Sequence, residues 1–155
     1  PRSATAVVAG LPKHVGEREL LRVCDRLGVS PSQARVEMPS DTLGPGNTLH
    51  VFLGADGYSN VFTGFGSPKV RAEQVADTAV SAAKAFLAHP AAVDEHLADQ
   101  LLLPLALARG GSFTTTEPSG HTRTNIDIIQ QFLDVPITTE PLGSGVWRIT
   151  VSPHS

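Results

Sequence analysis

The stretch RAEQVADTAVSAAKAFLAH, from Arg71 to His89, decides the fold class of this sequence. Its apolar residues recur at helical spacing, and charged or polar residues fall between them on the opposite side. This pattern predicts one long helix with a buried face, and Pro90 ends it. The residues expected to point inward are Val75, Ala79, Ala82, Ala83 and Phe86.

The residues before this helix predict strands and one further helix. ATAVVAG is an apolar strand, and apolar residues then recur at helical spacing from His14 to a stop at Gly28. QARVEMP alternates like a half-buried strand. LGPGNTLHVFLGAD predicts a turn followed by a strand, and NVFTGFG predicts an antiparallel neighbour for that strand.

The residues after Pro90 predict a second segment that mixes helices and strands. A helix begins at about Asp94, whose carboxylate can cap the free amides, and Gly110 closes it. SFTTT predicts a short strand, TNIDIIQQFL a helix, and PITTEP and VWRITVS two final strands. The stripe expected to be buried on the first of these helices is Leu97, Leu101, Leu105 and Ala108.

The order of these elements is typical of an α+β or an α/β fold, and we predict an α+β fold that contains α/β-type βαβ units. A boundary near Pro90 divides the chain into residues 1–91 and residues 92–155. With 155 residues, the chain is long enough for one ordinary domain or two small ones.

Composition excludes several classes of protein. The single cysteine, Cys24, rules out an internal disulfide, and LLLPLALA is too short an apolar run to cross a bilayer. A net charge of −3, no basic tract and 5% aromatic residues argue against an independent nucleic-acid binder. We therefore expect a protein of the cytoplasm with no membrane partner, and any RNA would be held partly by other residues.

One histidine stands out in SGHTRTNIDIIQ, residues 119–130. Thr124 and Asp127 match a capping box, which predicts that a helix begins there and that His121 lies about one turn ahead of it. The free amides of a helix start attract phosphate and disfavour a protonated imidazole, so His121 is a candidate nucleophile toward phosphorus. A solvated loop histidine is the structural alternative.

A second candidate site is DEHLADQLLLP, residues 94–104. Carboxylates at its start are explained by the helix dipole alone. Asp99 and Gln100 are harder to explain, because they lie in a helix of leucine and alanine shortly before Pro104. Proline has no amide proton, so the carbonyl of Gln100 is expected to lack its usual partner and to be free for a ligand or water.

The remaining motifs have structural explanations. GPGN and GFGSPK match neither the dinucleotide fingerprint nor the P-loop, and they suit turns. One cysteine and scattered histidines disfavour zinc, so no metal-ligating residues are predicted. Ser119 lies near His121, but no nucleophile elbow accompanies it, which disfavours a serine hydrolase.

Taken together, GPGN, EHLADQLLLPLALA, GGSFTT and PSGHTRTNIDIIQQFL, in this order and spacing, resemble the C-terminal half of RNA 3'-terminal phosphate cyclases. The resemblance spans nearly the whole chain. It implies that residues 1–91 are an inserted small α/β domain. Residues 92–155 would then be the last part of the large catalytic domain, built from a repeated helix-and-sheet unit.

The resemblance also implies a reaction. In that family a histidine takes AMP from ATP and passes it to an RNA 3'-phosphate, and the 2'-oxygen then displaces AMP to leave a 2',3'-cyclic phosphate. The matching histidine is His121, and ATP works with a divalent cation, Mg or Mn. The residues implied to form part of the ATP site are His96, Leu97, Ala98, Asp99 and Gln100.

Two departures from the family pattern matter. His96 stands where a tyrosine is common, so stacking on adenine is expected to be weaker or made differently. The glycine-rich motif and basic residues of the family's N-terminal half are absent, so that half, or a partner chain, is expected to complete the site. The alternatives are a non-catalytic scaffold for RNA processing or ribosome assembly, or an α+β interaction domain.

Overall fold

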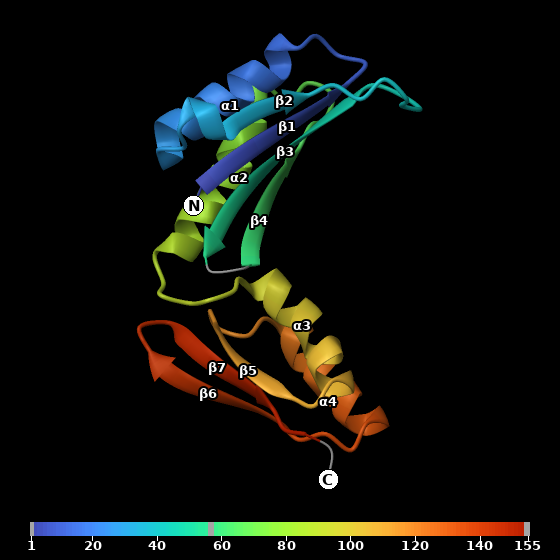
Figure 1. Ribbon diagram of the computed structural model, residues 1–155, viewed down its shortest axis with the longest axis vertical. Coiled ribbons are helices and arrows are strands. Elements are labelled where there is room, and N and C mark those ends of the chain that lie inside the picture. Colours follow the sequence, from blue (N-terminus) through green and yellow to red (C-terminus); the bar gives the residue numbers. More distant parts are fainter. Residues whose placement is uncertain (1, 56–57, 154–155) are drawn as a thin grey trace. The chain divides into compact units, whose positions relative to one another are not determined.

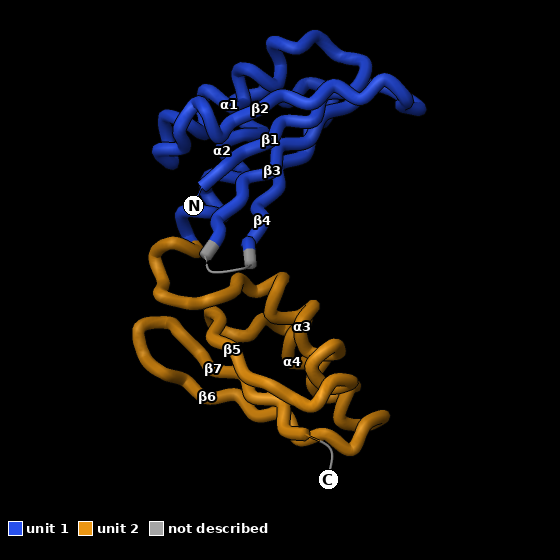
Figure 2. The backbone as a smooth tube through the Cα atoms, in the orientation of Figure 1, with its two compact units in different colours: residues 1–85 blue, residues 86–155 orange. Residues whose placement is uncertain are grey.

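The computed structural model describes residues 2–55 and 58–153. The chain forms two compact units, Pro1–Ala85 and Phe86–Ser155, shown in different colours in Figure 2. The division therefore falls in the last turn of α2 (Ala72–Leu87), a little before the boundary predicted near Pro90.

The assignment of residues 1–91 and 92–155 to parts of larger domains stays a prediction. The predicted strand LGPGNTLHVFLGAD ends at Asp56, which lies outside the described residues.

Unit 1 is a four-stranded sheet with the order β2-β1-β3-β4. β1 and β2 are parallel and joined through α1, which confirms the predicted βαβ unit, whereas β3 pairs antiparallel with both β1 and β4. Its elements, drawn in Figure 1, are β1 (Arg2–Ala9), α1 (His14–Leu27), a 3-10 turn (Pro31–Gln33), β2 (Ala34–Glu37), β3 (Gly46–Ala55), β4 (Tyr58–Phe65) and α2.

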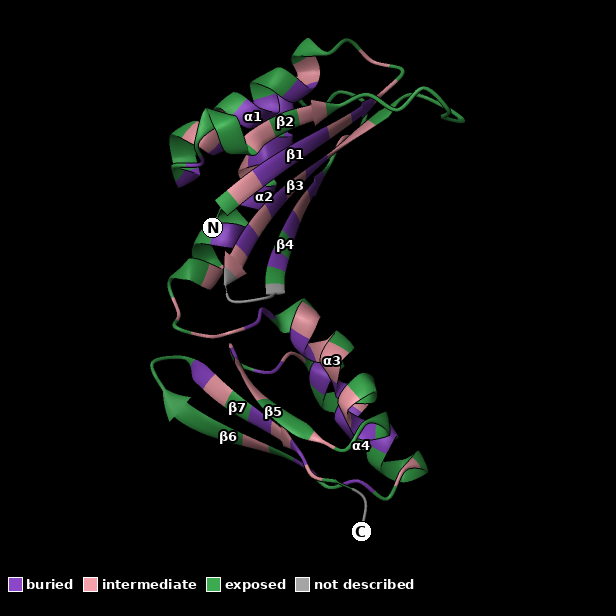
Figure 3. Cartoon of the chain, in the orientation of Figure 1, coloured by how far each residue is buried: buried purple, intermediate pink, exposed green. Residues whose placement is uncertain are grey.

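Both helices of unit 1 cover the same face of this sheet. Buried and less buried residues alternate along β3, as Figure 3 shows, because successive side chains point to opposite faces. In β1, Thr5 on the opposite face is buried as well as its neighbours Ala4 and Ala6. A Cβ at Gly16 of α1 would lie 2.8 Å from Val8, and a Cβ at Gly64 of β4 would overlap the carbonyl oxygen of Val75 in α2. The two glycines thus let both helices approach the sheet closely. Among the core residues of this layer are Ala4, Ala6, Val8, Val23, Leu49, Val51, Phe62, Val75, Ala79 and Ala83.

Two ion pairs join α1 to α2. Arg18 donates to Glu73 and Arg22 donates to Asp77, each with a shortest distance of 2.8 Å. These hydrogen bonds lower the pKa of both carboxyl groups. The pairs repeat at a spacing of four residues on both helices, so the helices lie side by side over the sheet.

Unit 2 is a three-stranded antiparallel sheet with the order β5-β7-β6, packed against two helices. Its elements are α3 (Glu95–Leu107), β5 (Gly111–Thr115), α4 (Gly120–Phe132), β6 (Ile137–Gly143) and β7 (Val146–Val151). Its core consists of Leu102, Ala106, Ile126, Ile129, Val135, Ile137, Ile149 and Val151. The mixed content of both units confirms the α+β fold class.

Two predicted helix faces are wrong in detail. On α3 the buried residues are Ala98, Leu102 and Ala106, one position along from the predicted leucine stripe. This helix is apolar on several sides, and its small alanines permit the closest packing. On α2, Ala82 was predicted to point inward and is exposed.

Among the described residues, no helix combines the length and apolar character needed to span a membrane.

Candidate functional site

A hollow of about 210 Å³ lies in unit 2 where α3 and α4 begin. Residues from two separate segments of the sequence line it: Glu95, His96, Asp99, Gln100, Ser119 and His121. The fold thus places the candidate histidine of α4 beside the candidate polar residues of α3.

Polar side chains from the first turns of α3 line the hollow. Asp94 caps the helix, as predicted, because its Oδ1 accepts a 2.8 Å hydrogen bond from the amide of Leu97. Residues three and four positions apart share a helix face, so Glu95 and His96 lie one turn before Asp99 and Gln100 on the same side. The side chain of His96 is 82% exposed, with its Nε2 3.9 Å from the Glu95 carboxylate.

The start of α4 lies earlier than predicted. Ser119, not Thr124, is the N-cap, and its Oγ accepts a 3.2 Å hydrogen bond from the amide of Thr122. The hydroxyls of Ser119 and Thr122 also lie 3.0 Å apart. His121 is therefore in the first turn of the helix instead of one turn ahead of it. The first amides of a helix have no carbonyl partner within it, so the positive end of α4 faces this part of the hollow.

Asn125 of α4 connects this helix to α3, the other helix that lines the hollow. Its Nδ2 donates to the carbonyl oxygen of Asp99 at 3.2 Å and to the Asp99 carboxylate at 3.1 Å. The Asp99 side chain is thereby held in a fixed orientation between α3 and α4.

The lining of the hollow carries two carboxylates and no lysine or arginine. Arg123 is close to His121 in sequence but points elsewhere. Its Nε donates to the carbonyl of Pro118 at 3.2 Å, and its guanidinium lies 5.6 Å from the ring centre of Trp147. Phosphate groups in this hollow would therefore need a metal ion or cations from outside the lining.

The helix α3 runs through Pro104. The carbonyl of Gln100 thus receives no hydrogen bond from the residue four positions on. Its availability for a ligand or water stays a prediction.

Four of the six site residues predicted from the sequence line the hollow: His96, Asp99, Gln100 and His121. Leu97 and Ala98 do not, since Ala98 is fully buried against the core and Leu97 is half-buried. Sequence reasoning missed Glu95, Ser119 and Asn125 as parts of the site. Capping and dipole arguments had already explained Glu95, and no local pattern indicated that Asn125 reaches α3.

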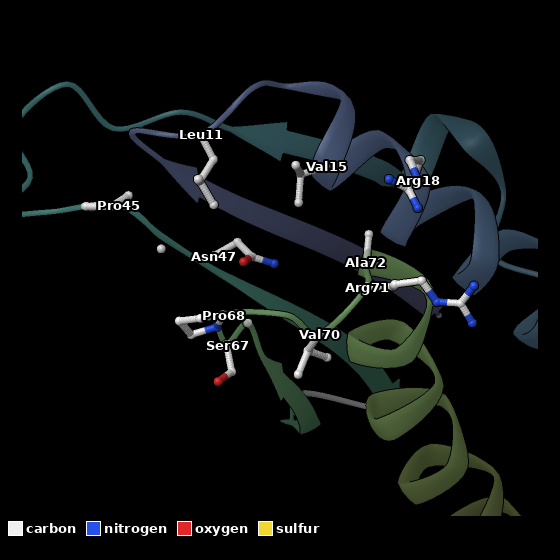
Figure 4. Close-up of a pocket in the computed structure, with 12 residues that line it drawn as sticks. Leu11, Val15, Arg18, Pro45, Asn47, Ser67, Pro68, Val70, Arg71 and Ala72 are labelled. Atoms are coloured by element: carbon white, nitrogen blue, oxygen red, sulfur yellow. The ribbon is translucent and has the colours of Figure 1, made fainter.

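Unit 1 contains a larger cavity of about 360 Å³, drawn in Figure 4, which holds none of the predicted site residues. Asn47 lies in its wall, and its side chain donates to the buried Glu19 of α1. The other carboxyl oxygen of Glu19 has no hydrogen-bond partner. Burial raises the pKa of Glu19 to about 7, although the hydrogen bond from Asn47 works in the opposite direction.

Within residues 2–55 and 58–153, no group of three or more histidine, cysteine, aspartate or glutamate side chains could hold a metal ion by itself.

Comparison with known proteins identifies one family. The family model described as RNA 3'-terminal phosphate cyclase matches residues 11–139. A protein of Pseudomonas fluorescens with the same name is 47% identical over 146 residues, which are 94% of this chain and 43% of the relative. Namesakes from Koribacter versatilis and Salmonella typhimurium are 44% and 40% identical over 86% and 92% of this chain. The chain thus spans 38–43% of the length of these three relatives.

Proposed function

The chain belongs to the RNA 3'-terminal phosphate cyclase family, and we propose that it supplies the nucleophilic histidine and part of the ATP site for that reaction. The substrate would be an RNA end with a 3'-phosphate, and the product a 2',3'-cyclic phosphate. The observation that carries this proposal is the hollow in unit 2, where His121 meets Asp99 and Gln100.

In the proposed first step, an unprotonated ring nitrogen of His121 attacks the α-phosphorus of ATP. The bond to the bridging oxygen breaks, and pyrophosphate leaves with the electron pair. An oxygen of the RNA 3'-phosphate then attacks the phosphorus held on His121, and the imidazole leaves. Finally the RNA 2'-hydroxyl attacks the 3'-phosphorus, loses its proton, and releases AMP. Covalent transfer divides one difficult displacement into easier ones.

The first turn of α4 would steady the anion. The amides of Gly120 and His121 have no partner within the helix and carry positive partial charge, whereas the amide of Thr122 already donates to Ser119. Gln100 and Ser119 add neutral polar groups to the lining. Preorganised donors of this kind stabilise developing charge on phosphorus oxygens.

A divalent cation would bring the positive charge that the lining lacks. Magnesium and manganese prefer oxygen ligands and usually keep several from substrate phosphates and water. The carboxylates of Glu95 and Asp99 have this chemistry and could supply one or two ligands. The cation would neutralise phosphate charge when bound.

We propose that residues beyond this chain complete the site. A hollow of about 210 Å³ is below the range of roughly 300–1,000 Å³ that small-molecule sites occupy, so it suits only part of an ATP molecule. The chain also spans less than half of its relatives. The other half of the enzyme, or a partner chain, would hold the remaining phosphates and the RNA. The scaffold alternative gives no role to a histidine that lines this hollow.

The proposal is tested with ATP labelled in its α-phosphate. The chain is incubated alone and together with the N-terminal half of a matching relative, and acid-labile label on the protein is measured. We expect label on the wild-type chain in the pair and none on His121→Ala. His14→Ala is a matched control, because His14 lies exposed at the start of α1 in the other unit. Equal labelling of wild type and His121→Ala would exclude the enzymatic proposal.

A further inference from the structure

The face of the unit 1 sheet that points away from α1 and α2 carries rings, hydroxyls and a guanidinium group. The strand registers place Thr5 of β1 between Arg35 of β2 and His50 of β3, and His50 beside Thr63 of β4. These four side chains form a row across the sheet. In the described residues of unit 1 no helix lies over this face, as Figure 1 shows.

A hollow of about 280 Å³ opens on this face. Its lining residues are Ser3, Thr5, Ser32, Gln33, Arg35 and Phe52. It therefore combines one phenyl ring, one cation and four side chains that can donate and accept hydrogen bonds.

A second ring stands next to the phenyl ring. The ring centres of His50 and Phe52 are 6.4 Å apart, with the planes tilted by 46°. Both ring nitrogens of His50 lie near hydroxyls, at 3.2 Å from Thr48 and 3.1 Å from Thr63. These contacts fix the imidazole, so the rings present a preformed surface and little ordering is needed when a planar ligand binds.

Arg35, the cation of the hollow, is held only weakly by its present partner. Arg35 donates to Glu37 at 2.8 Å, but the two side chains are 71% and 49% exposed. An ion pair this exposed contributes roughly 0–1 kcal/mol. A phosphate, which accepts two parallel hydrogen bonds from a guanidinium group, would compete well with the Glu37 carboxylate for Arg35.

We propose that this hollow, together with the open sheet face around it, binds one nucleotide of a single-stranded RNA, with the base on the Phe52 ring and a phosphate at Arg35. Bases stack on aromatic side chains of open sheets in many RNA-binding proteins, and hydroxyl and amide side chains read the ribose and the base edges. The lining of the hollow offers a ring for the base, a guanidinium group for a phosphate, and hydroxyl and amide groups for the ribose and the base edges. The inference rests on the proposed function, since the RNA would be the chain whose 3'-phosphate reacts in unit 2.

The experiment measures binding and needs no catalysis. The 155-residue chain is titrated at low salt against a hexauridylate that carries a 3'-phosphate and a 5' fluorophore, and anisotropy gives the Kd. Phe52→Ala should raise the Kd roughly tenfold, while Phe52→Tyr keeps the wild-type value. Arg35→Gln should flatten the plot of log Kd against log salt by about 0.7, the slope for one contact to single-stranded phosphate. Glu37→Gln should tighten binding, because it releases Arg35.

Phe65→Ala is the matched control. Phe65 is 72% exposed on the same sheet face but outside the lining of the hollow, so its loss should leave the Kd unchanged. The inference fails if wild type does not bind the hexauridylate, or if Phe65→Ala weakens binding as much as Phe52→Ala. Thermal unfolding of each variant checks that it folds. Label on His121 is scored separately, so loss of labelling contradicts the proposed function and loss of Phe52-dependent binding contradicts this inference.

Discussion

The side-chain amide of Asn125 holds Asp99 by two hydrogen bonds, 3.2 Å to its carbonyl oxygen and 3.1 Å to its carboxylate. The donor belongs to α4 and the acceptors belong to α3, so this side chain links the two helices that line the hollow. It also fixes the direction of a carboxylate that, in our proposal, lies near the phosphates of ATP. Asn125 thus acts as a positioning residue, without lining the hollow itself.

Asn125→Ala should lower the free energy of unfolding by about 0.5–1.5 kcal/mol, the usual net contribution of a hydrogen bond. Asn125→Asp should cost more, because it places a second carboxylate beside Asp99. Both variants should also label more weakly with ATP in the reconstituted pair. Thermal unfolding and labelling are measured on the same samples. If Asn125→Asp unfolds at the same temperature as Asn125→Ala, the contact with the Asp99 carboxylate is unimportant.

The Asn125 contact also shows where sequence reasoning stopped. Periodicity and caps are local signals, so they predicted the βαβ unit, the α3 cap at Asp94 and most of the elements. The predicted cap at Thr124 was wrong, because the structure uses Ser119, five residues earlier. No local signal says which residue of another helix a side chain will contact, and so Asn125 was missed.

The hollow on the sheet of unit 1 was missed for a related reason. Its residues come from β1, the 3-10 turn, β2 and β3, and only the strand registers bring them together. The low overall aromatic content hid the fact that Phe52 and His50 are neighbours on one face. By contrast, the residues implied by the family resemblance came as two compact motifs, and four of them do meet in unit 2.

His96→Tyr should tighten ATP binding. The side chain at this position is 82% exposed, so a larger ring costs no packing. The resemblance to the cyclases implies that a tyrosine is common at the position of His96. A phenol ring offers a larger stacking surface for adenine than an imidazole ring does. A stacked aromatic pair contributes roughly 0.5–1.5 kcal/mol, so the Kd for ATP should fall about two- to tenfold. Calorimetry on the reconstituted pair measures this, with His96→Ala as the variant without a ring. Equal affinity of all three proteins would exclude stacking at residue 96.

Gly64→Ala should strongly destabilise unit 1. A methyl group at Gly64 of β4 would overlap the carbonyl oxygen of Val75, and backbone of α2 has to move to relieve this. Overpacking of this kind costs about 1–3 kcal/mol. Gly46→Ala is the matched control in β3, since a Cβ there meets nothing within 4 Å. Urea unfolding followed by circular dichroism should show a lower midpoint for the Gly64 variant alone. Equal midpoints would mean that α2 does not lie as close to β4 as described.

Glu19 should make unit 1 less stable as the pH rises toward neutrality. Its pKa is about 7 in the folded protein, against 4.5 for an unburied carboxyl group. Between these values the folded state holds the proton and the unfolded state has lost it, so stability falls as pH rises through this window. Glu19→Gln keeps the hydrogen bond from Asn47 to an oxygen but has no proton to lose. We therefore expect the melting temperature of the variant, relative to wild type, to increase from the lower to the upper end of the window. The difference in melting temperature at any one pH includes the cost of burying an amide. The change of that difference with pH reports the titration of Glu19. A difference that is the same at both ends would show that Glu19 ionises as freely in the folded protein as in the unfolded chain.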